Sequence, residues 1–271
     1  MTVPDIRLIA VDMDGTLLLP DGSVPDGLWP LLDRLHELGI AFAPASGRQL
    51  ATLQAMFGGV GGELDYIAEN GAYVVRGEVE VSTDAVAPGV VASVISRLRT
   101  LVAGGTLHAG LVVCGKASAY IEDTEPAFLA EVEKYYAKLQ IVDDLTAIDD
   151  QVLKLAIYDF DGGERHTAPV LVDVAQTHQV VVSGQHWVDI MNSTVNKGVA
   201  LRRLQQELGV TAAQTAAFGD YLNDIELLQA ADWSYAMADA HPDVCAVARF
   251  RAPSNADAGV LTVIEDLLAR D

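Results

Sequence analysis

The chain has little of three things that define other classes of protein: cysteine, positive charge and long apolar runs. Two cysteines in 271 residues, Cys114 and Cys245, provide neither a disulfide framework nor a metal cluster. Only 17 lysines and arginines stand against 38 acidic residues, a formal net charge of −21, so we expect neither nucleic acid nor an anionic membrane as a partner. The most apolar stretch, residues 90–102, is interrupted by Arg97 and Arg99 and does not predict a membrane span.

The N-terminal region also lacks the apolar core of a signal peptide. Asp5 and Asp12 come too early for one, so we expect a cytoplasmic protein. What the chain does contain is 51% hydrophobic residues and 23 glycines. That apolar content excludes disorder and suits one large domain or two modest ones. Because the surface is acidic, a site for an anionic ligand must create its own local positive field.

Hydrophobic periodicity predicts alternating strands and helices at both ends of the chain. Residues 7–11 form a short apolar run typical of a buried parallel strand. Leucines then recur at helical spacing over 28–38 until Gly39, and residues 40–45 predict a second strand. The pattern returns later, with a helix expected at 196–208, a strand at 215–218, a helix at 222–230 and a strand at 233–237. Both ends therefore predict α/β structure with a parallel sheet.

The middle of the chain predicts a different arrangement. Helices are expected at 87–102, 125–138 and 166–176, and strands at 111–114, 119–121, 152–158, 180–183 and 187–191. Paired strands alternating with single helices suggest an antiparallel sheet covered on one face. We therefore predict a core made of residues 1–84 and 191–271, with an α/β domain inserted at 85–190.

The residues with the clearest chemical meaning follow the first predicted strand. Asp12, Met13, Asp14, Gly15 and Thr16 stand where ligands bind in open α/β sheets, beyond the carboxyl end of a strand. Two carboxylates at this spacing can share one metal and one substrate. A carboxylate attacks phosphorus usefully only when a cation neutralises the charge repulsion. Taken alone, the segment could also be a plain acidic turn.

Three further segments follow in order: residues 46–48 (Ser-Gly-Arg) after the second strand, Lys197 at a helix start, and residues 219–224 (Gly-Asp-Tyr-Leu-Asn-Asp) after another strand. Together with residues 12–16, they resemble the motifs of the haloacid-dehalogenase-like phosphohydrolases, and among these the Cof-type subfamily, over nearly the whole chain. The resemblance implies a Rossmann-like core with a parallel sheet and an inserted α/β cap with an antiparallel sheet. It also implies a Mg²⁺-dependent phosphatase that hydrolyses a small phosphomonoester, such as a sugar phosphate or related metabolite, with specificity read by the cap.

The resemblance also assigns roles to individual acidic residues. Asp12 would attack phosphorus and form an aspartyl-phosphate, while Asp14 would protonate the leaving oxygen and then activate water. Asp12, the backbone carbonyl of Asp14, and Asp220 would hold Mg²⁺. Asp224 would complete the acidic set, through water or by orienting Lys197.

Phosphate and substrate contacts fall to a second group of residues. Ser46 and Lys197 would donate to the phosphoryl oxygens, Lys197 being the local cation that the acidic surface lacks. The other candidates are Thr16, Gly47, Arg48 and Asn223 in the core segments and Lys154 in the insert. Several have a plainer alternative: a turn or cap for Ser46, a solvated lysine for Lys197, a structural salt bridge for Arg48, helix capping for Asn223 and Asp224, and an exposed strand lysine for Lys154.

Three remaining positions bear on the resemblance. Asn70-Gly71 also resembles a recurring Cof-type segment but is most simply a turn, because that dipeptide favours positive φ. Asn255 would position an acidic side chain or belong to a plain loop. Tyr221 departs from the subfamily, which carries a small residue there. Two other functions stay open: a sugar phosphomutase, which nothing in the motifs excludes, and a non-catalytic regulatory or sugar-binding protein, against which the intact acidic residues and Lys197 argue. The sequence makes no prediction of oligomeric state or of the particular phosphoester.

Overall fold

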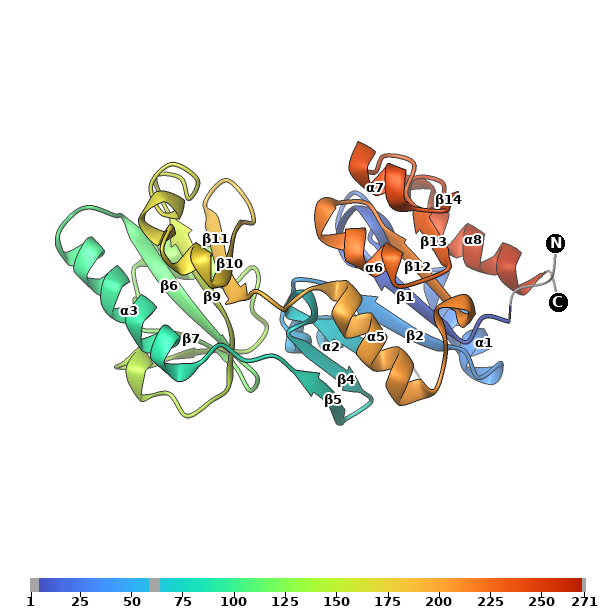
Figure 1. The fold of residues 1–271 in the computed structure, drawn as a ribbon, viewed down its shortest axis with the longest axis horizontal. Coiled ribbons are helices and arrows are strands. Elements are labelled where there is room, and N and C mark those ends of the chain that lie inside the picture. The colour runs from blue at the N-terminus through green and yellow to red at the C-terminus, as the bar shows by residue number, and fades with distance from the viewer. Residues whose placement is uncertain (1–4, 59–63, 270–271) are drawn as a thin grey trace. The chain divides into compact units, whose positions relative to one another are not determined.

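The computed structural model describes residues 5–58 and 64–269, whose contacts divide the chain into two units (Figure 1). The first, here called the core unit, comprises Met1–Gly47, Leu53–Ser82 and Asn196–Asp271. The second, here called the inserted unit, comprises Arg48–Thr52 and Thr83–Val195. In the described ranges, every helix is too short or too polar to cross a lipid bilayer.

The core unit is built on an eight-stranded sheet in the order β14-β13-β12-β1-β2-β3-β4-β5. Its strands are β1 (Leu8–Asp12), β2 (Ala41–Ala45), β3 (Asp65–Ala68), β4 (Tyr73–Arg76), β5 (Val79–Thr83), β12 (Thr215–Gly219), β13 (Trp233–Ala236) and β14 (Phe250–Arg251). The strands from β14 to β3 are parallel, which confirms the predicted parallel sheet, whereas β4 pairs antiparallel with β3. Every residue of β1 is buried, as its unbroken apolar run predicts.

Helices flank this sheet, and their ends follow from the sequence. They are α1 (Leu28–Glu37), α2 (Leu50–Met56), α5 (Lys197–Leu208), α6 (Ile225–Gln229), α7 (Pro242–Val247) and α8 (Gly259–Leu268). The Asn196 side chain caps α5 by accepting a hydrogen bond from the backbone N–H of Val199, 2.8 Å away. Gly209 ends the same helix in the left-handed conformation, φ +66°. Buried residues of α5, α6 and α7 pack in one cluster against the same face of the sheet.

The order of the strands creates a crevice at one place. From β1 the chain crosses through α1 to β2 on one side, whereas from β12 it crosses through α6 to β13 on the other side. Because such crossovers are right-handed, the two connecting helices lie on opposite faces of the sheet. The carboxyl ends of β1 and β12 are thus left open between them, at the kind of switch point where α/β proteins bind ligands.

The inserted unit contains a six-stranded sheet in the order β10-β11-β9-β6-β7-β8. Its elements are α3 (Pro88–Ala103), α4 (Pro126–Val132), β6 (Ala109–Gly115), β7 (Ala119–Ile121), β8 (Leu139–Ile141), β9 (Val152–Asp159), β10 (His178–Val182) and β11 (Trp187–Asn192). Most neighbours are antiparallel, but β7 and β8 run parallel, so the sheet is mixed rather than purely antiparallel.

The expectation of a sheet covered on one face is wrong, because β9 contributes to a core on both faces. Leu155 packs in one cluster with Val94 of α3. The neighbouring Ala156 points to the other face and packs in a second cluster with Phe128 of α4. The insert therefore has two small hydrophobic cores, one on each side of its sheet.

Two helices predicted for the insert are also shorter than expected. The helix expected at 125–138 ends at Val132, because the buried Tyr136 packs against Cys114 and the chain then pairs as β8 with β7. The helix expected at 166–176 is only two single turns, at Ala168–Leu171 and Val174–Gln176. Pro169 stands inside that segment and lacks the N–H that a continuing helix needs.

Candidate active site

The site begins where β1 ends, at Asp12. The buried strand carries Asp12 to the carboxyl edge of the sheet, and the turn Met13–Leu17 follows at once. Gly15 in this turn has φ +79°, and a Cβ atom there would lie 2.3 Å from Oδ2 of Asp220. The glycine therefore permits the β1 turn and the Asp220 carboxylate to approach each other closely.

A buried ion triad connects β1 with the later half of the core unit. The Lys197 ammonium donates hydrogen bonds to Oδ1 of Asp12 and, at 2.7 Å, to Oδ1 of Asp224. The Lys197 side chain is only 1% exposed and that of Asp224 is fully buried. A cation in the first turn of a helix is unfavourable, so the two carboxylates offset the repulsion from the N-terminus of α5. The solvated-lysine alternative for Lys197 is therefore wrong.

A third carboxylate, that of Asp220, lies beside the two of this triad. Among the residues that the structure describes, Asp12, Asp220 and Asp224 offer oxygen atoms that all lie within 4.8 Å of one another. Oδ2 of Asp224 accepts hydrogen bonds from the backbone N–H groups of Asp220 (3.0 Å) and Tyr221 (3.2 Å). Its other oxygen accepts a hydrogen bond from Lys197, so Asp224 holds both the loop of residues 220 and 221 and the lysine in place.

A fourth side chain joins the cluster from the β1 turn. The hydroxyl of the buried Thr16 donates to Oδ1 of Asp220 at 3.0 Å. In the structure, the Thr16 hydroxyl thus bonds to the carboxylate of Asp220. Asp14, by contrast, has an exposed side chain and does not belong to the carboxylate cluster found among the described residues.

The electrostatics of the cluster favour the arrival of a cation. Burial, and then the charge of Asp224, raise the pKa of Asp12 well above its usual range, while Lys197 acts in the opposite direction. Burial and the charge of Asp224 likewise raise the pKa of Asp220. Burial alone would lower the pKa of Lys197, but Asp12 and Asp224 together raise it. One ammonium among three carboxylates leaves an excess of negative charge, and a divalent cation with oxygen ligands fits that set.

The second motif lies on the neighbouring strand. Asp12 pairs with Ala45 across β1 and β2, so Ser46 leaves the sheet at the same edge. The buried Ser46 is fixed through its backbone: its N–H donates to the carbonyl of Ile67 (2.8 Å) and its carbonyl accepts from the N–H of Asn70 (2.9 Å). The edge of the sheet thus brings the first, second and fourth motifs together.

One residue of this edge was missed as a functional candidate. Asn70 follows β3 and was interpreted as part of a turn, yet its side-chain amide lies against Gly47 and accepts a hydrogen bond from Nδ2 of Asn223 at 3.4 Å. The available signal was its position, because β3 is the third parallel strand and Asn70 stands just beyond its carboxyl end.

Two predicted substrate contacts belong to the inserted unit. Arg48 lies in the short segment 48–52 that groups with that unit. Lys154 lies on β9 and is 5% exposed, with its Nζ atom 3.6 Å from Oδ2 of Asp189 on β11. The alternative of an exposed strand lysine is therefore wrong for Lys154. Substrate contact by either residue stays a prediction.

The two other positions singled out from the sequence are also placed. Asn255 donates to the backbone carbonyl of Leu18, 2.7 Å away, and so supports the chain just beyond the β1 turn. The Tyr221 side chain is 59% exposed and meets the ring of His241 edge to face, with 5.9 Å between ring centroids.

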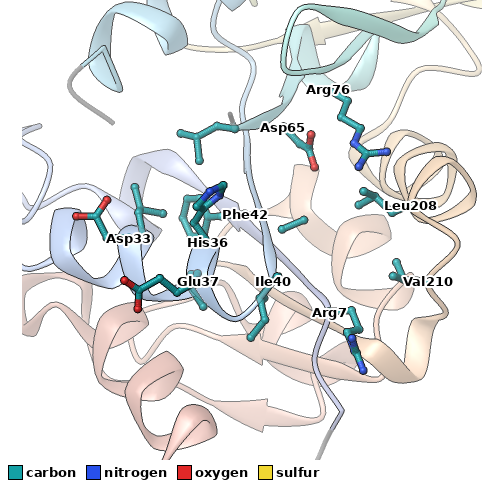
Figure 2. A pocket seen from close by; sticks show the side chains of 15 residues that line it. Arg7, Asp33, His36, Glu37, Ile40, Phe42, Asp65, Arg76, Leu208 and Val210 are labelled. Atoms are coloured by element: carbon teal, nitrogen blue, oxygen red, sulfur yellow. The ribbon is translucent and has the colours of Figure 1, made fainter. Parts of the chain in front are cut away.

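A separate cavity of about 650 Å³ opens at the other edge of the core sheet (Figure 2). Its lining includes Arg7, Ile40 and Asp65, which precede or begin β1, β2 and β3. These are the amino ends of the strands, whereas Asp12 and Ser46 lie at the carboxyl ends. The cavity is therefore distinct from the site of the acidic cluster.

Comparison with known proteins agrees with this geometry. The haloacid dehalogenase-like hydrolase family matches residues 9–264, and the chain belongs to this family. It is 32% identical over 269 residues to the 5-amino-6-(5-phospho-D-ribitylamino)uracil phosphatase YbjI of Escherichia coli, covering 98% of this chain and 97% of the relative. It is 29% identical over 249 residues to the HMP-PP phosphatase of Cronobacter sakazakii, covering 89% and 87%.

A solved structure shows the same fold over almost the whole length. The crystal structure of SMU.1108c from Streptococcus mutans UA159 superposes with a TM-score of 0.82 at 28% identity, covering 97% of this chain and 99% of that one. The family and the α/β fold predicted from the four motifs are thereby confirmed.

Proposed function

We propose that this chain hydrolyses a small phosphomonoester through an aspartyl-phosphate intermediate on Asp12. That it is a phosphatase follows from its family and from its phosphatase relatives. The observation that carries the finer proposal is the buried triad of Asp12, Lys197 and Asp224 beside Asp220, at the switch point of the sheet. A carboxylate that could act as nucleophile, a fixed cation and an acidic set that could hold a metal lie within a few ångströms of one another, which supports the proposal.

The chemical roles proposed are those that the resemblance to the family assigns to each group. Asp12 attacks phosphorus, the bond from phosphorus to the leaving oxygen breaks, and the carboxyl of Asp14 gives that oxygen its proton. Asp14, now a carboxylate, takes a proton from water, whose oxygen attacks the aspartyl-phosphate and releases inorganic phosphate. The exposure of Asp14 supports this role, because a group that exchanges protons with leaving group and water must be reachable.

The donor set fits Mg²⁺, which prefers oxygen ligands. Asp12, Asp220 and the backbone carbonyl of Asp14 would hold the ion, while Asp224 supports the site through Lys197 and the loop of residues 220 and 221. When bound, the ion neutralises the repulsion between the Asp12 carboxylate and the phosphate group. Lys197 and Ser46 would donate to the phosphoryl oxygens, with Gly47, Arg48 and Asn223 as further contacts.

The inserted unit would read the leaving group, and Lys154 is its best candidate contact. The E. coli relative acts on a phosphate ester of a ribityl chain and the Cronobacter relative on HMP-PP. We therefore expect the substrate to be a phosphorylated sugar, a sugar alcohol derivative or a related metabolite. Residues 85–190 would be the specificity domain and the remainder the catalytic domain.

A phosphatase screen tests the proposal. Purified protein is assayed for phosphate release from a metabolite panel that includes both relatives' substrates, with Mg²⁺ and with EDTA, and with Asp12→Asn as the matched variant. We expect Mg²⁺-dependent release by the wild type and almost none by the variant. Transfer between sugar positions that depends on a bisphosphate activator, without net phosphate release, would instead indicate a phosphomutase. Absence of turnover on every compound would overturn the proposal.

A further inference from the structure

The segment after β3 has an unusual backbone. Glu69, Asn70 and Gly71 follow one another with φ values of +49°, +55° and +101°. The left-handed region is unfavourable for residues that carry a Cβ atom, although asparagine tolerates it better than most. Two non-glycine residues in succession keep this conformation only where the surroundings impose it. We call residues 69–71 the β3 turn.

The β3 turn is fixed from two sides by segments of the proposed phosphate site. The N–H of Asn70 donates to the carbonyl of Ser46 at 2.9 Å. On the other side, a Cβ atom on Gly71 would lie 2.6 Å from the carbonyl oxygen of Asn196, the residue just before Lys197. The backbone of the turn is therefore placed directly between the second motif and the start of α5.

The side chain of Asn70 adds two more contacts. A Cβ atom on Gly47 would lie 3.0 Å from Nδ2 and 3.1 Å from Oδ1 of Asn70, so the amide group lies flat against the glycine. The three atoms nearest to that position all belong to Asn70. Oδ1 of Asn70 also accepts a hydrogen bond from Nδ2 of Asn223 at 3.4 Å. One amide thus contacts the second and the fourth motif.

We propose that Asn70 is a positioning residue for phosphate recognition, an inference that rests on the proposed function. Its left-handed backbone places the amide between Gly47 and Asn223, and its N–H fixes Ser46 at the same time. The spacing of the second and fourth motifs is thereby set by one side chain. The amide is neutral, so it orders these segments without adding another carboxylate beside an incoming phosphate.

The geometry also explains why residue 47 is glycine. Gly47→Ala places a methyl group against the Asn70 amide, so the two groups must separate. Asn70→Gly removes the amide yet keeps a residue that adopts the left-handed backbone readily. A methyl group at position 47 then has the room that Asn70 had occupied. The pair therefore predicts compensation in phosphate affinity, which a turn that affects stability alone would not show.

The experiment is a double-variant cycle with two readouts. Gly47→Ala, Asn70→Gly and the double variant are compared with wild type for kcat/KM and for the dissociation constant of inorganic phosphate, measured by calorimetry in Mg²⁺. We expect each single variant to weaken phosphate binding about tenfold, which corresponds to about 1.4 kcal/mol. The phosphate affinity of the double variant is expected to fall by less than the product of the two single-variant effects. Asn70→Asp keeps the shape but adds charge, and is expected to raise KM more than it lowers kcat.

Thermal unfolding of each variant separates this role from a loss of fold. A folded Asn70→Gly protein with wild-type phosphate affinity and kcat/KM would overturn the proposal, as would strictly independent effects in the double variant. The calorimetric readout requires no turnover. A wild type that binds phosphate but hydrolyses no ester would therefore overturn the proposed function while the cycle still decides the role of Asn70. A wild type that binds no phosphate would overturn the proposal for Asn70, while its turnover in the phosphatase screen decides the proposed function separately.

Discussion

Lys197 donates a buried hydrogen bond to Asp12, although 185 positions of sequence separate the two residues. The same ammonium reaches Asp224, so the first and last motifs of the site meet on one cation. Removal of Lys197 leaves two buried carboxylates without their counterion, which is strongly unfavourable. The proposed catalytic residues are therefore also structural residues, and each substitution below needs a measurement of fold beside that of activity.

Asp12→Asn is expected to lower turnover at least about 10³-fold, because it removes a nucleophile and a metal ligand together. The amide keeps the shape of the carboxyl group, so the protein should remain folded. Turnover on p-nitrophenyl phosphate in saturating Mg²⁺ and circular dichroism are the two measurements. Asp26→Asn, at an exposed position, is the matched control. Near-normal turnover of the Asp12 variant would contradict its assignment.

Asp14→Asn is expected to lose about 10²- to 10⁴-fold on alkyl phosphates, the usual contribution of general acid–base catalysis. The loss should be smaller on p-nitrophenyl phosphate, whose leaving group hardly needs a proton. The apparent Mg²⁺ affinity should be unchanged, because the side chain lies outside the carboxylate cluster. An equal loss on both kinds of ester would argue against a role as general acid.

The metal requirement is tested through Asp220. We expect EDTA to abolish activity, Mg²⁺ to restore it and Ca²⁺ to inhibit, because Ca²⁺ prefers longer bonds and more ligands. Asp220→Ala should raise the Mg²⁺ concentration needed for half-maximal activity at least about tenfold, in line with the loss of one direct ligand. Thr16→Val removes the hydroxyl on Asp220 and should have the same effect, but weaker. Full activity of the wild type in EDTA would exclude a metal-assisted mechanism.

The buried Asp12 should make the metal-free protein less stable as the pH rises from about 4. Burial raises the folded-state pKa of Asp12 above its unfolded value, so the folded state binds more protons in that window. Stability therefore falls with rising pH up to the folded-state pKa. Asp12→Asn removes this group, so its melting temperature in EDTA should match that of wild type near pH 4 and exceed it near pH 7. A difference in melting temperature between the two proteins that does not change with pH would contradict the raised pKa of Asp12.

Substitution of Lys154 is expected to change both the substrate specificity and the stability of the protein. Lys154→Ala should raise KM for the best natural phosphoester more than for p-nitrophenyl phosphate, which offers little for the inserted unit to bind. It also leaves the buried Asp189 without its ion-pair partner, so the protein should melt at lower temperature. The control Lys154→Ala/Asp189→Asn also removes the unpaired charge of Asp189. It should therefore recover the wild-type melting temperature but not the wild-type substrate specificity. An unchanged ratio of KM values in the stable double variant would exclude Lys154 as a reader of substrate.

Much of the core could be predicted from the sequence, because its signals are local. The apolar run that ends at Asp12 and the cap and glycine that bound α5 need no knowledge of the remainder of the chain. The order of the motifs then places their residues at one edge of a parallel sheet. The insert was predicted less well, because its elements depend on distant partners. Residues 139–141 form a strand only because β7 lies beside them.

Within the site, the contacts of Asn70 likewise could not be predicted from the local sequence. An asparagine followed by glycine has one local meaning, a turn with positive φ. Its contact with Gly47 and its bond with Asn223 depend on how β2, β3 and β12 are arranged, which the dipeptide does not encode. Likewise, the pairing of Lys154 with Asp189 depends on β9 lying next to β11. Composition and spacing identified the chemical groups, and only the topology identified their neighbours.

The position of β1 in the sheet has a consequence for biosynthesis. β1 lies between β2, which is made soon after it, and β12, which begins at Thr215. At typical translation rates the intervening stretch of about 200 residues takes roughly 10–40 seconds to synthesise. For that time one edge of an apolar strand has no partner, an arrangement that favours aggregation. The strands of the inserted sheet all lie within residues 109–192, so that sheet is complete on the ribosome before the core sheet can close.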